Sequence, residues 1–279
     1  MLGHDVLSTL GNYDITGLTR SQLDITDYSA VEAALESFDV VINTAAFTAV
    51  DDAETQQDLA YAINADGPRN LARACQLDGA TLIHVSTDYV FDGTAKVAYA
   101  ENSPANPQSV YGASKYQGEQ AVLEECPEHS IILRTSWLYG EHGNCFPRAI
   151  LRAGQEKDQL EVVDDQHGQP TWTIDVANMM QSLIDNQIST GIFHATNSGA
   201  TTWNGFARKL FELAGWDPER IGATTTEAFP RPAPRPAWSV LGHENWSING
   251  LPSPRNWEVA LEEAWGAGLS NFALRKDGR

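Results

Sequence analysis

The sequence predicts an α/β protein built around a doubly wound parallel sheet. Short apolar runs rich in β-branched residues alternate with stretches of helical periodicity as far as Ala195. Strands that are apolar throughout are typical of parallel sheets, because helices cover both faces of such a sheet. A chain of 279 residues has room for a sizeable core, in one large domain or two closely associated ones.

The elements can be assigned in order along the chain. We expect strands at Asp14–Leu18, Val40–Asn43, Thr81–Ser86, Ser130–Arg134, Leu160–Val163 and Gly191–Ala195. We expect helices at Tyr28–Ser37, Asp52–Leu77, Val110–Glu124, Phe146–Gln155 and Ile174–Ile188. Helices that separate strands in this way supply the crossover connections that a parallel sheet requires.

The rhythm changes after the last of these strands. One more helix is expected at Trp203–Ala214 and a final one at Asn256–Ala264. Between them, prolines at every second position exclude a helix over Phe229–Trp238 and favour an extended segment. We therefore predict a dinucleotide-binding domain over residues 1–196 and a smaller substrate-binding lobe over residues 197–279, with contributions from residues 140–156.

The charge balance is strongly acidic. Asp and Glu together number 37 and Lys and Arg 18, which gives a formal net charge of −19. Binding of nucleic acid through a basic face is excluded, because that mode needs clustered Lys and Arg to neutralise phosphates. We interpret the charge as adaptation to a high-salt cytoplasm, where a Debye length of about 3 Å at 1 M salt screens self-repulsion. The alternative is a merely acidic protein from ordinary salt.

Neither a membrane partner nor a metal is expected. No run approaches the roughly 20 apolar residues that span a bilayer. Met1–Leu10 lacks the basic start and apolar run of a signal peptide, so a cytoplasmic location is predicted. Cys75, Cys126 and Cys145 are odd in number and show no metal-ligand or disulfide spacing.

A tyrosine and a lysine one helical turn apart are the main candidates for chemistry. Tyr111 and Lys115 share one face of a predicted helix, so the phenol and the ammonium can point into one cleft. A phenol has a pKa of about 10 in water. A neighbouring ammonium lowers this pKa and makes the phenol a usable acid–base group. Thr87 follows a predicted strand at the end where open α/β sheets bind ligands. The pair could also be a simple surface contact, but its place after Ser86-Thr87-Asp88 favours catalysis.

The residues around this group resemble a known family. Val85-Ser-Thr-Asp-Tyr-Val-Phe-Asp-Gly93 together with Tyr111-x-x-x-Lys115 is similar to the extended short-chain dehydrogenase/reductases. The finer pattern resembles the dTDP-4-dehydrorhamnose reductase family, in family order over nearly the whole chain. The segments that carry this finer resemblance are Asn43–Glu54, Arg134–Tyr139, Asp165–Thr171, Gly191–His194 and Arg235–Ser239.

This resemblance implies an oxidoreductase that acts on a nucleotide-linked sugar with NADPH, or alternatively NADH. Tyr111 would donate a proton to the sugar's carbonyl oxygen, Lys115 would hold the nicotinamide ribose, and Thr87 would hydrogen-bond the carbonyl. Asp88 and Trp137 match positions that line the sugar site, although Trp137 is equally well interpreted as a core aromatic residue. The residues implied at the cofactor, besides Tyr111 and Lys115, are Leu2, Gly3, Asp24, Ile25, Ala45, Ala46, Phe47 and Thr48.

Arginines are the candidates for phosphate groups. Arg20 follows the first predicted strand, where an Arg suits a 2′-phosphate and an acidic residue suits a 2′-hydroxyl. Arg20 therefore favours NADPH, while the nearby Asp24 argues against it. His167 is interpreted as a residue that faces solvent or the substrate rim. The candidates for the nucleotide diphosphate are Arg231, Arg235 and Arg255, because a guanidinium presents forked donors to phosphate.

The N-terminus departs from the family pattern. The family begins with a strand and a G-x-x-G-x-x-G turn whose N–H groups hold a pyrophosphate, whereas Met1-Leu2-Gly3-His4 matches only the last part of that turn. Loss of that strand would expose two strand edges within the sheet. We expect either a start assigned at an internal methionine or a degenerate, inactive paralogue.

Two classes of function follow. The first is an enzyme that reduces dTDP-4-dehydro-6-deoxy-L-mannose (dTDP-4-dehydrorhamnose) to dTDP-L-rhamnose, or that reduces, epimerises or dehydrates another nucleotide sugar. The second is a non-catalytic NADP-binding regulatory subunit, similar to the beta subunit of methionine adenosyltransferase. The retained Thr87, Tyr111 and Lys115 favour the enzyme, and the incomplete Gly-rich turn favours the binding subunit. A homodimer is compatible with both.

Overall fold

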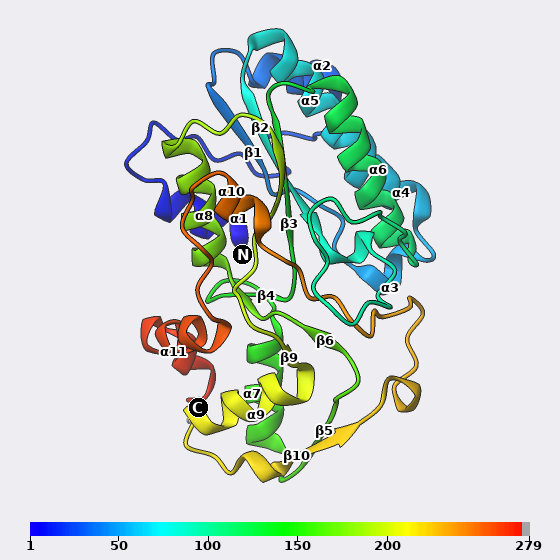
Figure 1. Cartoon of the computed structure of the whole chain (residues 1–279), viewed down its shortest axis with the longest axis vertical. Coiled ribbons are helices and arrows are strands. Elements are labelled where there is room, and N and C mark those ends of the chain that lie inside the picture. Colours follow the sequence, from blue (N-terminus) through cyan, green and yellow to red (C-terminus); the bar gives the residue numbers. More distant parts are fainter. Residues whose placement is uncertain (275–279) are drawn as a thin grey trace.

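A four-stranded parallel sheet forms the centre of the larger part of the molecule. The computed structural model describes residues 1–274. The strand order is β1 (Val40–Asn43), β2 (Thr81–Thr87), β3 (Ser130–Thr135) and β8 (Gly191–His194) (Figure 1). Every residue of β3 is buried, as expected for a central strand of an apolar sequence. These four strands confirm four of the predicted ones and the doubly wound α/β class.

Three helices cover one face of this sheet, over the strands β1, β2 and β3. They are α2 (Tyr28–Ala34), α5 (Gly67–Asp78) and α6 (Val110–Glu125), which lie together along the sheet in Figure 1. Leu82 of β2 and Ile132 of β3 belong to the buried cluster under these helices. The helix α5 ends at Gly79, whose φ of 72° provides the left-handed C-terminal residue.

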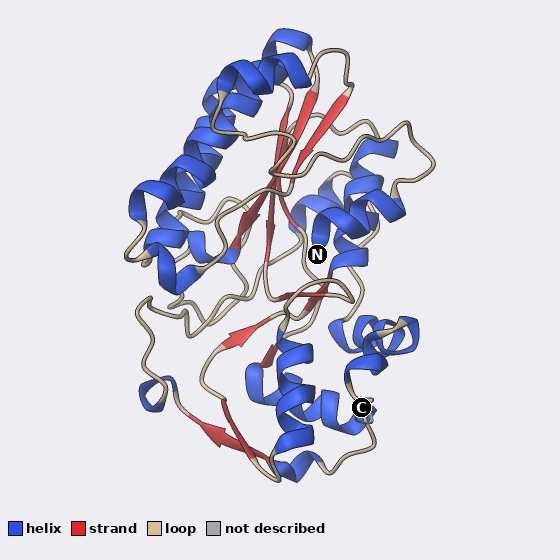
Figure 2. Ribbon diagram, turned by 180° about the vertical axis from the view of Figure 1, so that it is seen from behind, coloured by secondary structure: helices blue, strands red, loops and turns tan. Residues whose placement is uncertain are grey.

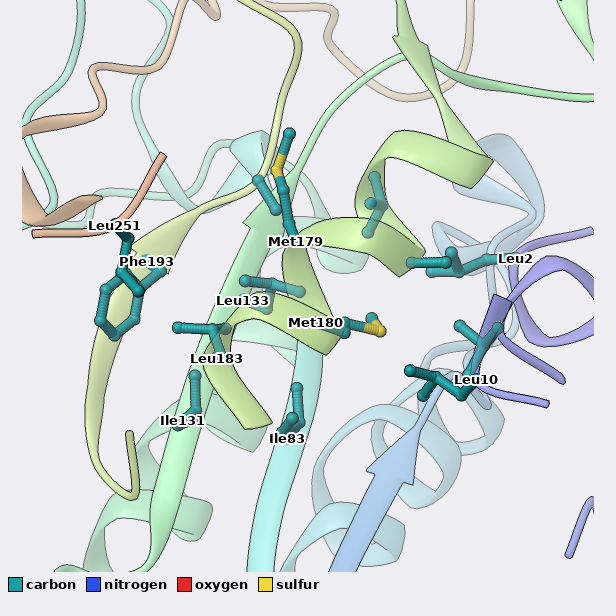
Figure 3. Close-up of a cluster of buried hydrophobic side chains, with 14 of the residues drawn as sticks. Leu2, Leu10, Ile83, Ile131, Leu133, Met179, Met180, Leu183, Phe193 and Leu251 are labelled. Atoms are coloured by element: carbon teal, nitrogen blue, oxygen red, sulfur yellow. The ribbon is translucent and has the colours of Figure 1, made fainter. Parts of the chain in front are cut away.

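Three other helices cover the opposite face, as Figure 2 shows from behind. They are α1 (Leu2–Thr9), α8 (Thr173–Asp185) and α10 (Glu244–Ile248). Successive strand residues point to opposite faces, so the neighbours of Leu82 and Ile132 lie on this side. The cluster drawn in Figure 3 joins α1 and α8 to the sheet through Ile83, Ile131 and Leu133.

The predicted strand at Asp14–Leu18 is wrong. The segment has no regular structure, and β1 pairs only with β2 among the described residues. Leu18 is 44% exposed, and Val40, Val41 and Ile42 of β1 are only partly buried. A strand needs a neighbour for its backbone N–H and C=O groups, and no strand between this segment and β1 supplies one. The other edge of β1 is therefore unpaired within residues 1–274.

The long helix predicted at Asp52–Leu77 is divided into shorter pieces. The chain forms α3 (Val50–Ala53), α4 (Gln57–Tyr61), a π-helical turn η1 (Ala62–Asp66) and then α5. The break falls at Gln56, whose ψ of 46° is not helical, and Pro68 occupies the first turn of α5. The π-helical turn matters for the site, because such turns change which residues face a neighbouring helix.

The smaller part of the molecule lies below the sheet in Figure 1. It contains α7 (Phe146–Glu156), α9 (Trp203–Leu213) and α11 (Trp257–Ala267). Its strand β5 (Leu160–Val163) pairs in parallel with β10 (Ile221–Thr224). The expectation that Leu160–Val163 belongs to the main sheet is therefore wrong. The strand is apolar on one side only, with Leu160 and Val162 buried and Glu161 exposed, so it suits an outer two-stranded sheet.

Short strand pairs and an extended segment connect the two parts. β4 (Leu138–Tyr139) pairs with β7 (Thr171–Trp172), and β6 (His167–Gly168) pairs with β9 (Thr201–Thr202). The proline-rich segment contains no helix over 229–238, as predicted. The remaining short helical turns are η2 (Asp88–Val90), η3 (Pro218–Arg220), η4 (Thr226–Ala228) and η5 (Leu269–Phe272).

The chain passes between the two parts more than once. Residues of α7 and β5 lie with α9 and β10 in the lower part, whereas α8, β8 and α10 lie against the main sheet (Figure 1). The predicted domains, residues 1–196 and residues 197–279, each form one continuous segment of the sequence, and these limits stay a prediction. Among residues 1–274, no helix has both the length and the apolar character needed to cross a bilayer.

Candidate active site

The predicted catalytic residues come from two adjacent elements of the main domain. Thr87 is the last residue of β2, at the carboxyl end of the sheet. The helix α6 begins after Ser109, whose side chain accepts a hydrogen bond from the N–H of Gly112. Tyr111 and Lys115 therefore lie in its first two turns, and α6 packs against β2.

Two glycines let α6 approach its neighbours closely. A Cβ at Gly112 would lie 2.2 Å from the carbonyl oxygen of Tyr89, and a Cβ at Gly118 would lie 2.0 Å from that of Asn64. No side chain fits at either point, so the glycines fix how deep the helix sits on the sheet. This close approach buries Lys115, which is only 2% exposed.

Lys115 is held from below by the sheet. Its Nζ donates a hydrogen bond to the carbonyl oxygen of Val85 at 2.6 Å and lies 3.4 Å from Nε2 of His84. Burial lowers the pKa of Lys115 to about 8, although the Glu119 carboxylate opposes this shift. The lysine can therefore exchange a proton close to neutral pH.

Tyr111 lies at the surface end of this group, partly exposed. Its ring meets the ring of Tyr89 edge to face, with centroids 5.5 Å apart. Desolvation raises the pKa of Tyr111 to about 12, and a hydrogen bond with Thr87 opposes the rise. Lys115 is not among the groups that shift this pKa in the structure, where its Nζ bonds to Val85 and lies next to His84, and its support of the phenolate stays a prediction.

Asp88 is a buried carboxylate next to Thr87. It is 3% exposed, its Oδ1 accepts a hydrogen bond from Thr87 Oγ1 at 2.9 Å, and its Oδ2 has no partner in the described structure. Desolvation raises the pKa of Asp88 to about 6, and the nearby hydroxyls of Ser239 and Thr87 oppose this rise. A buried, unpaired carboxylate oxygen is costly, and such groups are concentrated at functional sites.

A pocket of 460 Å³ brings together five of the eleven residues predicted at the cofactor. It lies beside the unpaired edge of β1, between that strand and the loop that follows α1. The predicted cofactor residues among those that line it are Arg20, Asp24, Ile25, Ala45 and Ala46. Phe47 and Thr48 follow in the chain but are not part of its lining.

The polar groups of this pocket suit a nucleotide that carries an extra phosphate. Arg20 is exposed and forms no ion pair with any residue from 1 to 274. Asp24 is turned toward its own loop, since its Oδ1 accepts hydrogen bonds from the N–H and the hydroxyl of Thr26 at 3.0 and 2.8 Å. The guanidinium is thus the available charged group, and the apolar Ile25 offers a wall for a base. These residues fit NADPH.

The N-terminal cofactor residues differ from each other in what they can contact. A Cβ at Gly3 would lie 3.0 Å from Thr44 Oγ1, so α1 begins close to the carboxyl end of β1. The side chain of Leu2, by contrast, is 7% exposed and belongs to the buried cluster in Figure 3. The Leu2 side chain therefore faces mainly the core, and its role at the cofactor stays a prediction.

Trp137 packs against other aromatic side chains and remains partly exposed, so both of its interpretations stay open. Its ring stacks on Trp203 with centroids 3.6 Å apart, and a Cβ at Gly168 would lie 2.4 Å from it. Its backbone is left-handed, with a φ of 46°, and the residue is partly exposed. Such strain is uncommon for a bulky residue and is typical of functional positions. Sequence reasoning missed Trp203, which has no motif of its own.

The three candidate arginines for the diphosphate are in different situations. Arg255 binds both oxygens of Asp175 at 2.7 and 2.9 Å and also pairs with Glu263, so it is a structural residue and this expectation is wrong. Arg235 pairs with Asp51 at 2.9 Å. Arg231 is exposed and forms no ion pair within residues 1–274, so it is the arginine left for a ligand.

One cluster of side chains could supply metal ligands. His4, Asp5 and His142 are the described residues that place three possible ligand atoms within 4.8 Å of one another. His167 is not among them and packs against Trp238, with ring centroids 5.4 Å apart. All three cysteines are free.

The doubly wound parallel sheet carries Thr87 at the end of β2 and Tyr111 and Lys115 on α6, and a pocket of nucleotide size reaches the carboxyl end of the neighbouring strand β1. These features together are those of an extended short-chain dehydrogenase/reductase. The chain belongs to the family described as RmlD substrate binding domain, whose model matches residues 1–268. This confirms the family predicted from the motifs.

Relatives and solved structures agree with this assignment. A dTDP-4-dehydrorhamnose reductase of Streptomyces griseus is 46% identical over 275 residues, which are 96% of this chain and 90% of that protein. A probable dTDP-4,6-dihydroxy-2-methyloxan-3-one 4-ketoreductase of Streptomyces antibioticus is also 46% identical, over 95% of this chain and 91% of that protein. The crystal structure of the Bacillus anthracis dTDP-4-dehydrorhamnose reductase in complex with NADP has a TM-score of 0.91 at 39% identity, with 95% of each chain covered.

Proposed function

We propose that this protein uses NADPH to reduce the 4-keto group of dTDP-4-dehydrorhamnose, which yields dTDP-L-rhamnose for glycan synthesis. The observation that carries the proposal is the placement of Thr87 at the carboxyl end of β2 with Tyr111 and Lys115 at the start of α6, which packs against that strand. The identity of 46% to a dTDP-4-dehydrorhamnose reductase over nearly the whole chain supports it.

The residues of the chain supply binding and proton transfer. NADPH, when bound, supplies the hydride. Thr87 orients the carbonyl, and Tyr111 donates its phenolic proton to the carbonyl oxygen as that oxygen becomes an alkoxide. The Lys115 ammonium binds the ribose hydroxyls and stabilises the phenolate that remains. Desolvation raises the pKa of Tyr111 to about 12, so the phenol holds its proton at neutral pH until a stronger base, the forming alkoxide, accepts it.

Arg20 and Arg231 are the residues we assign to the phosphate groups. Arg20 would bind the 2′-phosphate and thus favour NADPH over NADH. Arg231 would bind the diphosphate of the sugar nucleotide. Gly3 and Ala45 through Thr48 would lie along the rest of the cofactor, and Asp88 and Trp137 along the sugar.

A second candidate substrate is another dTDP-linked 4-keto sugar. The Streptomyces antibioticus relative and a dTDP-4-keto-6-deoxy-D-glucose reductase of Streptomyces niveus, 41% identical, have names that describe other 4-keto sugars. Equal identity to the first of these and to the rhamnose enzyme favours neither substrate. A non-catalytic regulatory subunit is disfavoured, because such a role does not require the three catalytic residues.

The direct test is the loss of NADPH absorbance with dTDP-4-dehydrorhamnose and, separately, with dTDP-4-keto-6-deoxy-D-glucose. We expect turnover with dTDP-4-dehydrorhamnose, and a fall in kcat of about 10²- to 10⁴-fold in Tyr111→Phe, because the proton donor is lost. Tyr116→Phe is the matched control, since it removes a phenol from the same helix outside the site. Full turnover in Tyr111→Phe would disprove the mechanism, and faster turnover of the other sugar would reassign the substrate.

A cytoplasmic location and a homodimer belong to the same proposal. Nucleotide sugars and NADPH are made and used inside the cell, which supports the first. Sedimentation of the purified protein tests the second, and a monomer at micromolar concentration would contradict it.

A further inference from the structure

Three buried polar side chains form a line beneath the candidate active site. Nζ of Lys115 lies 3.4 Å from Nε2 of His84, and Nδ1 of His84 lies 3.0 Å from Nδ2 of Asn43. The exposed fractions of these residues are 2%, 0% and 4%. Asn43 and His84 are direct partners in the register of β1 and β2, so the sheet holds them together.

The backbone decides which way the Asn43 amide faces. The N–H of Ala45 donates a hydrogen bond to Asn43 Oδ1 at 3.0 Å, so the NH₂ group is the part that faces His84. An NH₂ group only donates, and Nδ1 of His84 must therefore present its lone pair. Burial, together with the Lys115 charge, holds the pKa of His84 well below its usual range, so the ring is neutral. Its single proton is then on Nε2, which faces Lys115.

The Nε2–H tautomer of His84 disfavours the charged form of Lys115. The Lys115 ammonium has only N–H donors, so it is repelled by the His84 N–H that points toward it. A neutral amine has a lone pair that can accept this N–H. Both forms can donate to the carbonyl oxygen of Val85, so that bond does not distinguish them.

The other groups around Lys115 do not cancel the effect of the His84 N–H on its protonation. On α6, Glu119 lies one turn further on, but Arg134 of β3 binds its two oxygens at 2.9 and 2.7 Å and offsets its charge. Tyr111, also on α6, is a neutral phenol at physiological pH. The nearby side chains of β1 and η1, Asn43 and Asn64, are uncharged.

We propose that Asn43 and His84 are positioning residues that set the protonation equilibrium of Lys115: Asn43 selects the Nε2–H tautomer of His84, and this N–H favours the amine form of the lysine. The inference rests on the proposed function, in which the Lys115 ammonium binds the ribose and stabilises the Tyr111 phenolate. Loss of the ammonium ends that support, so the pair sets the pH above which activity declines.

The first test needs no variant. ¹⁵N spectra distinguish a protonated ring nitrogen from an unprotonated one, and through-bond correlations assign the signals to His84. We expect the proton on Nε2 in the wild-type protein at neutral pH. A proton on Nδ1 would overturn the proposal.

The second test measures the titration of Lys115 itself, through its ¹³Cε resonance identified with Lys115→Arg. We expect His84→Phe to raise the titration midpoint by about one pH unit, because the opposing N–H is removed. The alkaline limb of kcat/KM should move upward by the same amount, with kcat at neutral pH changed much less. An unchanged or lowered midpoint in folded His84→Phe would overturn the proposal.

His194→Phe is the matched control. His194 is also 0% exposed, and its Nδ1 lies 2.9 Å from the carbonyl oxygen of Gly242 and makes no bond with Lys115. The same substitution there should leave the Lys115 midpoint unchanged. Both spectroscopic readouts are independent of turnover, so absence of reductase activity in the wild type would count against the proposed function and not against this inference.

Discussion

Asp88 shows how a single residue at the site is expected to lower stability. Its pKa is raised from 3.8 to about 6 by desolvation, so the folded protein binds its proton more tightly than the unfolded chain. The raised pKa therefore destabilises the folded state above about pH 6, and the cost disappears as pH falls toward the unfolded value. Function at this position, in contact with the sugar under our proposal, explains why a costly carboxylate is placed there.

We predict that Asp88→Asn stabilises the protein and impairs turnover. The gain in the free energy of unfolding should be about 3 kcal/mol at pH 7.5 and about half of that at pH 5, because the raised pKa penalises the ionised form only where it is populated. Urea unfolding at the two pH values measures this difference. A gain that grows as pH falls would contradict the assignment. Asp92→Asn is the control, because hydrogen bonds lower the pKa of that partly buried carboxyl.

At the scale of one element, the position of α6 depends on its glycines. Gly118 lies against the carbonyl oxygen of Asn64, where a Cβ would be only 2.0 Å away. Asn64 in turn accepts the N–H of Phe47 at 2.8 Å and donates to Ser114 Oγ at 3.0 Å. The π-helical turn that carries Asn64 thus links α6 to the loop that follows β1.

We predict that Gly118→Ala is strongly destabilising although alanine is the better helix former. The methyl group must push α6 away from backbone atoms of η1, so we expect a cost near the upper end of the roughly 1–3 kcal/mol typical of overpacking, which exceeds the gain of about 1 kcal/mol in helix propensity. Gly266→Ala in α11 is the control, because a Cβ there meets nothing within 4 Å, and it should be neutral or stabilising. Thermal unfolding of both variants decides, and equal effects would contradict this account.

The whole molecule carries far more negative than positive charge. With 37 acidic and 18 basic side chains, most carboxylates have no basic partner available. Exposed pairs such as Arg152 with Glu156 contribute only about 0–1 kcal/mol each. Self-repulsion among the remaining carboxylates should therefore limit stability wherever salt does not screen it.

We predict that Tm rises with KCl well beyond physiological concentration. Screening continues to strengthen as the Debye length falls from about 10 Å at 0.1 M to about 3 Å at 1 M. Thermal unfolding across this range measures the effect, with an equal osmolarity of sucrose as the control for general exclusion from the surface. A Tm that is highest at or below about 0.15 M salt would contradict adaptation to high salt and leave the merely acidic interpretation.

Local sequence was sufficient wherever the signal is local. The four strands of the main sheet, α6, α7, α8 and α9 follow from apolar periodicity, and the i, i+4 spacing places Tyr111 and Lys115 on one helix face. The motifs also determined the family. What only the tertiary structure decided depends on neighbours distant in the chain.

Segment 14–18 has strand-like residues but no partner strand, and β5 finds its partner in β10 rather than in the main sheet. From sequence alone, Arg255 is a candidate for binding phosphate, whereas in the folded protein its guanidinium binds the Asp175 carboxylate. The pKa directions of Tyr111, Lys115 and Asp88 are set mainly by desolvation, which exists only after the chain has folded around them. Sequence patterns determine which secondary structure each segment can form. Strand pairing and burial are properties of the whole fold, and they determine the partners and the pKa values of its residues.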